Sequence, residues 1–409
     1  MMRLAPSVLV LCLSAGTLAA QGNSSDTMDT SIRPFEIHVP DSVLNDLNVR
    51  LDRTRFPDQI EDSDWDYGTD RDWLKELVEY WRTEYDWRKH ERRLNEFDHF
   101  RTAIDGLDIH FIHQHSRHED AMPLVITHGW PGSVCEFLEI IGPLTDPVAH
   151  GGKAEDAFHV ICPSMPGYGF SDKPRRPGYS VGRVGATVAE LMRRLGFEQY
   201  GAQGGDWGAA VTAWLGENDA EHVAGIHMNF AVVGPPAGAD DPNVGVTDKE
   251  LLRMRQRNQE LQNHWAYSQI QGTRPQTLGY GLNDSPAGLA AWITDKFYAW
   301  SDCHGAIENS FTKDELLTNV MVYWVTGTIT SSTRLYYESR RHPWTRGRVE
   351  VPTGVAVFPK ELRLPPRHWV EARYNLQHWN EMPRGGHFAA MEEPGLFVED
   401  LRTFFRTLR

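Results

Sequence analysis

The five residues Gly204-Gly205-Asp206-Trp207-Gly208 constrain the fold of this chain more than any other segment. Small residues around a central acid suit a sharp turn, because a strained backbone leaves almost no room for side chains on its flanks. Residues 196–203 have the pattern of a short strand entering the turn, and residues 209–215 that of a helix leaving it. A strand, a tight turn and a helix present a nucleophile at the edge of a sheet. The segment therefore predicts an α/β fold with Asp206 at such a turn.

A carboxylate at this turn indicates a particular chemistry. A serine would attack acyl carbons, whereas a carboxylate attacks saturated or strained carbon and leaves an ester that must itself be hydrolysed. The N-terminus of the following helix stabilises the negative charge of Asp206. The alternative is an ordinary turn in which Asp206 only caps a helix. The strand before the turn and the helix after it favour the catalytic interpretation.

The first twenty residues differ from the rest of the chain. Arg3, the apolar run 8–13 and the small residues up to Ala20 are typical of a signal peptide. The longer apolar stretch from Leu4 to Ala20 is interrupted by Pro6 and is shorter than the ~20 residues that a membrane-spanning helix needs. We therefore expect a signal peptide at 1–20 and an exported protein, secreted or periplasmic. A membrane anchor at the N-terminus is the alternative, and it is not favoured.

Charge and cysteine content exclude several classes of protein. The 409 residues carry 56 Asp and Glu against 41 Lys and Arg, a net charge of −15, whereas a nucleic-acid-binding protein needs a basic face. Outside the signal peptide the cysteines are Cys135, Cys162 and Cys303. Three cysteines without short spacing form neither a disulfide framework nor a zinc site, although one bridge is compatible with the sequence.

A group of histidines raises the question of a metal site. It comprises His110, His113, His115 and His118, on and after an expected strand. No carboxylate or cysteine spacing completes a recognised set of ligands. A polar strand edge explains the group, and we predict no metal and no cofactor.

The order of the expected elements divides the chain. Helical spacing at 43–51, after the candidate cap Asp41, and at 73–81 indicates an N-terminal appendage that packs its aromatic residues on a larger body. Beyond it, strand-like and helical runs alternate, which predicts a mostly parallel sheet covered on both faces. The expected strands are 107–113, 123–127, 158–162, 223–230 and 354–358, and the expected helices include 184–195 and 396–408.

One long interval interrupts this alternation. Helical stretches at 250–265 and 314–325 predict a helical cap inserted over the carboxyl edge of the sheet, where open α/β sheets bind ligands. We interpret the basic run 340–346 as a solvated segment that leads from this insertion back to the core. The predicted organisation is a signal peptide (1–20), an N-terminal appendage (21–100), the first part of the core (101–232), the cap (233–342) and the second part of the core (343–409).

A covalent carboxylate mechanism needs a base, an acid that orients the base, and donors for an oxyanion. His387 follows two glycines that let its imidazole approach the turn, and Glu361 follows an expected strand. The chain order of nucleophile, acid and histidine suits this triad. The backbone N–H groups of Trp130, in a bend after the strand 123–127, and of Trp207 are the candidate oxyanion donors.

These residues resemble a known family. From about Ile32 to the C-terminus the chain is similar to epoxide hydrolases of the α/β-hydrolase superfamily, microsomal-type branch. The matching segments are His128-Gly129-Trp130-Pro131, Gly204-Gly205-Asp206-Trp207-Gly208, Phe358-Pro359-Lys360-Glu361-Leu362 and Gly385-Gly386-His387-Phe388-Ala389-Ala390. The resemblance implies the α/β-hydrolase fold with a mostly parallel central sheet, a helical cap and an N-terminal meander. The N-terminal appendage corresponds to that meander. A glutamate as the triad acid favours the microsomal branch.

The resemblance also implies two cap tyrosines that hold the epoxide oxygen. Tyr267 matches the first and Tyr336 the second, with Tyr337 adjacent to the latter. The expected partner is a small-molecule epoxide, apolar or aromatic, and a homo-oligomer is compatible with the sequence. Two rivals stay open: a haloalkane dehalogenase, which shares the Asp-Trp pair but usually carries Asn where this chain has Trp130, and a catalytically inactive binding protein.

Overall fold

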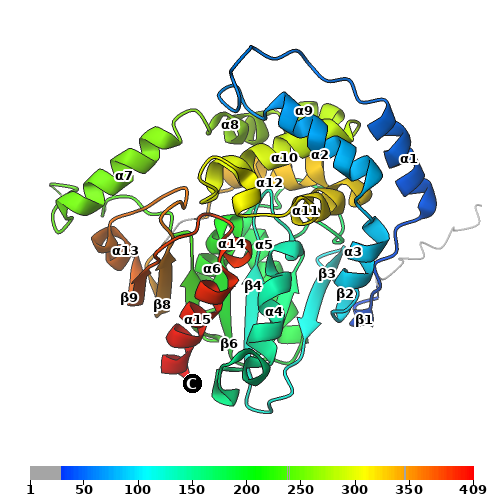
Figure 1. Cartoon of the computed structure of the whole chain (residues 1–409). Helices are drawn as coiled ribbons and strands as arrows, with labels where there is room; N and C mark the ends of the chain where they lie inside the picture. Colours follow the sequence, from blue (N-terminus) through cyan, green and yellow to red (C-terminus); the bar gives the residue numbers. More distant parts are fainter. Residues whose placement is uncertain (1–28, 237, 239, 345–346) are drawn as a thin grey trace, which may run out of the picture.

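A computed structural model describes residues 29–236, 238, 240–344 and 347–409 (Figure 1). The signal peptide expected at 1–20 lies outside the described residues. Within those residues, no helix combines the length and the apolar character that crossing a bilayer requires.

A nine-stranded sheet lies at the centre of the described part of the chain, in the order β1-β2-β3-β5-β4-β6-β7-β8-β9. Pairing is antiparallel from β1 through β2 and β3 to β5, and parallel from β5 to β9. The mostly parallel sheet that the sequence predicted is therefore confirmed. The strands are β1 (Arg33–Pro34), β2 (His99–Ile104), β3 (Leu107–Gln114), β4 (Met122–Thr127), β5 (Phe158–Pro163), β6 (Tyr200–Gly204), β7 (Val223–Met228), β8 (Val349–Val357) and β9 (Tyr374–Glu381).

Helices cover both faces of the sheet. Alternate residues of β4 belong to two separate apolar clusters: Val125 to one, Leu124 and Ile126 to the other. The first cluster includes α5 (Val181–Arg194) and α6 (Asp206–Asn218). The second includes α4 (Leu138–Thr145) and α15 (Pro394–Phe405), with the short α14 (Ala389–Glu392) beside them. Because strands buried on both faces need apolar residues at every position, the run 123–127 lacks polar alternation.

Among the described residues, six α-helices lie between β7 and β8 and sit over one edge of the sheet (Figure 1). Two begin at capping boxes, Thr247 with Glu250 and Thr312 with Glu315, which satisfy the free N–H groups of the first turn. The helices are α7 (Asp248–Glu260), α8 (Ala266–Thr273), α9 (Pro275–Leu282), α10 (Pro286–Trp300), α11 (Lys313–Thr326) and α12 (Ile329–Arg341).

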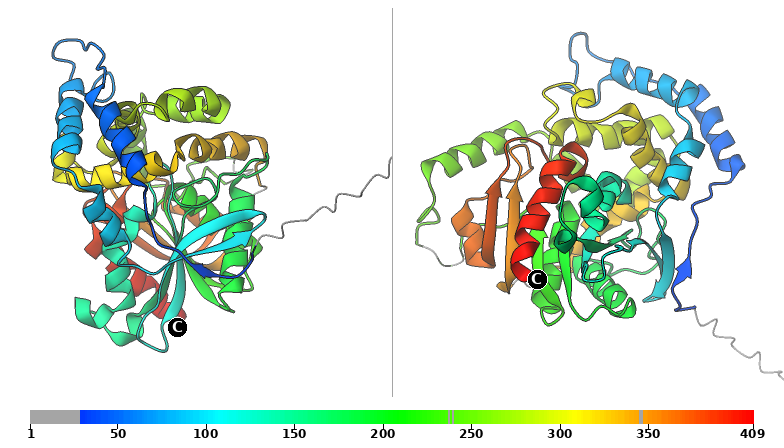
Figure 2. Two further views of the ribbon diagram at one scale, coloured as in Figure 1. Left: turned by 90° about the vertical axis from the view of Figure 1, so that its right-hand side faces the viewer. Right: turned by 60° about the horizontal axis from the view of Figure 1, so that its bottom comes forward.

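The N-terminal meander lies along the outside of the cap, as both views of Figure 2 show. Its helices are α1 (Asp41–Asp52), α2 (Arg71–Thr83) and α3 (Trp87–Leu94). Trp65 stacks on Tyr298 of α10 with ring centroids 4.0 Å apart, and the Tyr80 hydroxyl donates to Asp314 of α11 at 2.8 Å. The expected cap of α1 was wrong, because the N-cap is Pro40 and Asp41 is the first helical residue.

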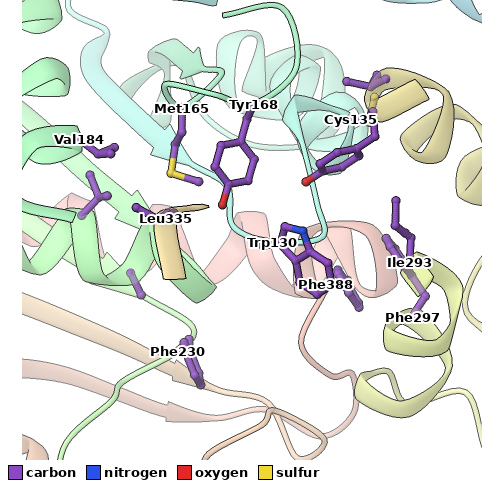
Figure 3. Packing of buried hydrophobic residues seen from close by; sticks show 14 of the residues in the cluster. Trp130, Cys135, Met165, Tyr168, Val184, Phe230, Ile293, Phe297, Leu335 and Phe388 are labelled. Carbon is purple, nitrogen blue, oxygen red and sulfur yellow. The ribbon is translucent and has the colours of Figure 1, made fainter. Parts of the chain in front are cut away.

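Apolar residues of the cap and of the core share one cluster (Figure 3). Trp130 and Phe388 lie at its centre, with Ile293 and Phe297 of α10 to one side. The rings of Phe297 and Phe388 stack face to face with centroids 3.9 Å apart. This end of α10 is therefore packed onto the core.

The other sequence expectations have mixed outcomes. The expected strand 196–203 begins only at Tyr200, after a turn in which Gly196 has φ +82°. Cys135, Cys162 and Cys303 are buried free thiols. His110 hydrogen-bonds His99 and Ser164, each at 2.9 Å, and the described residues hold no group of three side chains suited to a metal.

Candidate active site

Asp206 lies at the turn between β6 and α6, at the carboxyl edge of the parallel strands. Its φ of 48° is in the left-handed region, which an aspartate adopts only under constraint. A Cβ at Gly208 would come within 1.8 Å of the Thr127 carbonyl oxygen, and one at Gly204 within 2.2 Å of the Gly208 oxygen. The turn thus has the strained geometry that the sequence predicted, and glycine is required where other backbone crosses it.

One oxygen of the carboxylate is held by the loop after β4. The Trp130 N–H donates to Asp206 Oδ1 at 2.8 Å, next to a cis Trp130–Pro131 bond. The Trp207 N–H lies in the first turn of α6, where N–H groups have no acceptor within the helix. Burial lowers the pKa of His128 to about 4, so this ring is neutral, and its Nε2 accepts from the Met165 N–H at 3.3 Å.

The other oxygen faces the predicted base. His387 Nε2 is 3.6 Å from Asp206 Oδ2, and His387 Nδ1 is 2.5 Å from Glu361 Oε1. Both His387 and Glu361 are buried. Burial opposes protonation of the imidazole, but the charges of Glu361 and Asp206 outweigh it and raise the pKa of His387 to about 10. The ring is therefore an imidazolium while Asp206 is ionised.

Two phenols from the cap approach the same carboxylate. Tyr267 on α8 stacks on Trp130 with centroids 5.3 Å apart, and Tyr336 on α12 meets the Trp207 ring edge to face at 4.8 Å. Burial raises the pKa of both phenols well above the ordinary range, so both stay protonated donors. The Tyr336 hydroxyl is buried and makes no hydrogen bond of good geometry within the described residues.

The adjacent tyrosine has a different environment. Tyr337 packs its ring against the Arg341 guanidinium, 3.4 Å from the ring centroid, and does not line the cavity around Asp206. The structure therefore brings Tyr336, and not Tyr337, to the carboxylate.

Comparisons with known proteins agree with this arrangement. A family model described as "Epoxide hydrolase N terminus" matches residues 32–137, and one described as "alpha/beta hydrolase fold" matches residues 122–279. A Stigmatella aurantiaca protein provisionally named an epoxide hydrolase is 50% identical over 379 residues, covering 92% of this chain and 86% of that protein. Rabbit (Oryctolagus cuniculus) "Epoxide hydrolase 1" is 42% identical over 404 residues, covering 92% of this chain and 89% of that protein.

The chain belongs to the epoxide hydrolase family. The crystal structure of juvenile hormone epoxide hydrolase from the silkworm Bombyx mori matches it with a TM-score of 0.87 and 35% identity, over 94% of this chain and 96% of that one. The resemblance to epoxide hydrolases and the predicted α/β-hydrolase fold are both confirmed. Membership also makes the chain an enzyme, a hydrolase of epoxides.

The hydrolase has a cavity of about 250 Å³ on the cap side of Asp206. Tyr267 and Tyr336 line it, together with the apolar side chains Trp207, Phe230, Trp265 and Leu362. Arg340, in the last turn of α12 and the first residue of the basic run, also lines the cavity and donates to the Gln269 side chain at 3.0 Å. Arg340 is exposed, as expected for a solvated segment, and it also borders the cavity.

Cap residues that the sequence did not reveal hold the triad in place. Arg257 of α7 is buried and donates to the carbonyl oxygens of Glu361 at 2.9 Å and Lys360 at 2.5 Å. An arginine among charged neighbours on a helix is expected to be solvated, and Arg257 is the one buried residue of α7, so no spacing within the helix could have revealed it. The cap thereby fixes the backbone of the triad acid.

The base is attached to the cap in a similar way. The His387 N–H donates to the Trp300 carbonyl at 2.9 Å, at the end of α10. The Gly385 N–H donates to Asp302 at 3.0 Å, and Glu392 accepts from the N–H groups of Asp302 at 2.7 Å and Phe388 at 2.9 Å. These reciprocal bonds join the histidine loop to the segment after α10.

Proposed function

We propose that this hydrolase converts an apolar or aromatic epoxide to a vicinal diol through an ester on Asp206. One observation carries the proposal: a single carboxylate stands between two protonated phenols, Tyr267 and Tyr336, and a histidine paired with Glu361. Ring opening needs a nucleophile and proton donors, whereas ester hydrolysis needs a base. Both sets of groups meet at Asp206.

In the first step a carboxylate oxygen of Asp206 attacks an oxirane carbon. The carbon–oxygen bond of the epoxide breaks, and its electron pair stays on the oxygen as an alkoxide. An alkoxide is costly to leave without partners in a buried cavity, so the O–H groups of Tyr267 and Tyr336 donate to it as the charge develops. Their raised pKa values keep the donor protons in place until then.

In the second step water attacks the ester carbonyl carbon. Before this attack the alkoxide takes the proton of the His387 imidazolium, which leaves a hydroxyl group and a neutral imidazole. His387 then takes one proton from that water, and the N–H groups of Trp130 and Trp207 stabilise the oxyanion. Collapse passes the second proton of the water to the leaving oxygen, expels the diol and restores the carboxylate with one oxygen from water. Since esterification removes the charge of Asp206, which helps to raise the pKa of His387 to about 10, alkylation itself makes the imidazole easier to deprotonate.

The cavity supports the choice of substrate class. Its volume of about 250 Å³ and its indole, phenyl and leucine lining suit a compact apolar molecule. The Arg363 guanidinium stacks 5.0 Å over the Trp265 ring, which keeps this cation against an aromatic face.

One observation bears on the dehalogenase alternative. The Trp207 indole N–H is buried and has no hydrogen-bond partner within the described residues, which is an environment that a halide could use. A departing halide needs no proton, however, whereas an alkoxide does, and two protonated phenols serve the alkoxide. Turnover of styrene oxide and of 1-bromobutane by the purified protein separates these activities from each other and from a binding protein that turns over neither.

Oxygen isotopes test the covalent step. In a single turnover in oxygen-18 water, the first diol should carry no label, because its new oxygen comes from Asp206. Diol labelled completely in the first turnover would instead require direct attack by water on the epoxide.

Substitution of the base separates the two half-reactions. His387→Gln should open the epoxide and stall at the ester, so intact-protein mass spectrometry should show an adduct equal to the substrate mass. A folded His387→Gln variant that turns over normally, or that never forms the adduct, contradicts these roles.

We also propose that the protein is exported by the signal peptide at 1–20. This proposal is supported by the sequence pattern of that segment. N-terminal sequencing of the mature protein tests it, and a mature chain that begins at Met1 would favour the membrane anchor.

A further inference from the structure

A second, half-buried acid lies beside the catalytic carboxylate. Glu136 follows the loop that supplies the Trp130 N–H, in a short 3₁₀ helix between the buried residues Cys135 and Phe137. It lines one small cavity together with Asp206 and His387. The proposed mechanism gives this acid no role.

The size of this cavity limits what it can hold. Its volume is about 20 Å³, which is enough for one water molecule and far too small for an epoxide. Among the described residues, Asp206 alone lines both this cavity and the one of about 250 Å³. The carboxylate therefore separates a chamber of substrate size from a chamber of water size.

The carboxyl group of Glu136 is held on the water side of Asp206. A Cβ at Gly132 would come within 1.5 Å of Glu136 Oε1, so only glycine leaves room for the acid there. The Gly129 N–H also faces this carboxyl as a hydrogen-bond donor. Burial raises the pKa of Glu136 to about 8, helped by the charges of Asp206 and Glu361 and opposed by that of His387. Whether protonated or ionised, the group keeps a carbonyl-type oxygen that can accept a hydrogen bond.

We propose that Glu136 positions the hydrolytic water in the small cavity behind Asp206. The water donates one O–H to His387 Nε2 and the other to an oxygen of Glu136, which directs a lone pair at the ester carbonyl carbon. Glu136 forms no covalent bond and gains or loses no proton in this step. The inference rests on the covalent mechanism of the proposed function, and it assigns Glu136 to the second half-reaction only.

The test compares three substitutions by single-turnover kinetics with styrene oxide. Glu136→Leu removes the acceptor at similar volume, Glu136→Gln keeps an acceptor oxygen, and Glu139→Gln is a matched control because Glu139 is exposed and pairs with Arg93. Replacement of an enclosed charged group by an apolar residue of similar size is often tolerated, and Glu136 is only half-buried, so Glu136→Leu should fold. If its circular dichroism shows otherwise, Glu136→Met takes its place.

We expect alkylation within about twofold of the parent in every variant, followed by Trp fluorescence. Ester hydrolysis should fall on the order of 10- to 100-fold in Glu136→Leu, since misplacement of a reacting group by 1 Å can cost 10²-fold. Glu136→Gln should recover most of that loss, and Glu139→Gln should match the parent. The Leu variant should also accumulate ester at steady state, and its kcat and KM should fall together.

Two results overturn the inference. Glu136→Leu could hydrolyse the ester within twofold of the parent rate, or it could slow alkylation as much as hydrolysis, which would indicate a purely structural role. Failure of the covalent mechanism is distinguishable, because then neither the parent nor His387→Gln forms any ester, whatever residue occupies position 136.

Discussion

Removal of the Tyr336 hydroxyl should separate activity from stability. This hydroxyl is buried, and among the described residues it has no hydrogen bond of good geometry, although the Tyr267 phenol is close enough to affect its pKa. Tyr336→Phe therefore removes at most a poorly aligned contact with the Tyr267 phenol in the resting enzyme. A buried hydroxyl without a partner costs about 1–3 kcal/mol, so the variant should be as stable as the parent or more stable, by up to about 2 kcal/mol.

The same change should slow ring opening strongly. Loss of one donor to a developing oxyanion raises the barrier by about 2–4 kcal/mol, or roughly 30- to 1000-fold in rate. Trp130 and Trp207 lie 5.9 and 4.8 Å from the Tyr336 ring, so stopped-flow indole fluorescence should report alkylation directly. Tyr337→Phe is the matched control, because Tyr337 packs against Arg341 outside the cavity.

Either of two outcomes would refute this reasoning. If Tyr336→Phe alkylates at the rate of the Tyr337→Phe control, the phenol is only a packing residue. If it alkylates slowly but loses more than about 2 kcal/mol of unfolding free energy, the hydroxyl makes a bond in the resting enzyme and the slow rate can result from a distorted cap. Tyr267→Phe should also slow alkylation, and the double variant should be nearly inactive yet folded.

Three further substitutions test the supports of the site. Arg257→Met should slow ester hydrolysis on the order of tenfold in single turnover, because the buried guanidinium holds the backbone of the triad acid. The control is Arg255→Met at an exposed position, and equal hydrolysis rates in the two variants would contradict this role. Burial raises the pKa of Glu136 from 4.5 to about 8, so the parent should lose folding stability as the pH rises through that interval. Glu136→Gln lacks the titrating group and should not show this loss. The unfolding midpoint of that variant relative to the parent should therefore be higher at pH 8 than at pH 5, and an unchanged difference would argue against the raised pKa. Gly208→Ala should prevent folding, because its Cβ would come within 1.8 Å of a carbonyl oxygen, while Gly281→Ala, with open space around it, should keep or slightly raise the melting temperature.

The sequence predicted the parts of the fold that local patterns encode. The buried parallel strands are short apolar runs, and the turn at Asp206 needs glycines at fixed offsets, so both were found in the sequence. β9 was missed because its sequence, Tyr374–Glu381, is largely polar and lies at the edge of the sheet. β1 was missed because it has only two residues, and β2 because its sequence, His99–Ile104, mixes polar and apolar residues without a clear alternation.

The catalytic residues could be predicted at positions where a short segment of sequence identifies both the residue and its role. Asp206, Glu361 and His387 each follow a strand, and parallel strands bring their carboxyl ends together at the same edge. Arg257 and Glu136 could not be recognised, because charged residues on helices are usually solvated, and only the packing of distant segments buries Arg257 and half-buries Glu136. The choice between Tyr336 and Tyr337 likewise depends on the rotation of α12 against the core.

The attachment of the histidine loop to the end of α10 limits how substrate reaches the nucleophile. If the cap opened by lifting α10, it would carry away the Trp300 carbonyl and Asp302, which hold the loop of the base, and it would also have to displace the meander that crosses its outer side. We therefore expect epoxide to enter and diol to leave on the opposite side of the cap. The path passes Trp265 and Arg340, at the cavity between α8, α12 and β9. The enzyme can then exchange ligands through a side passage while its catalytic groups stay assembled from one turnover to the next.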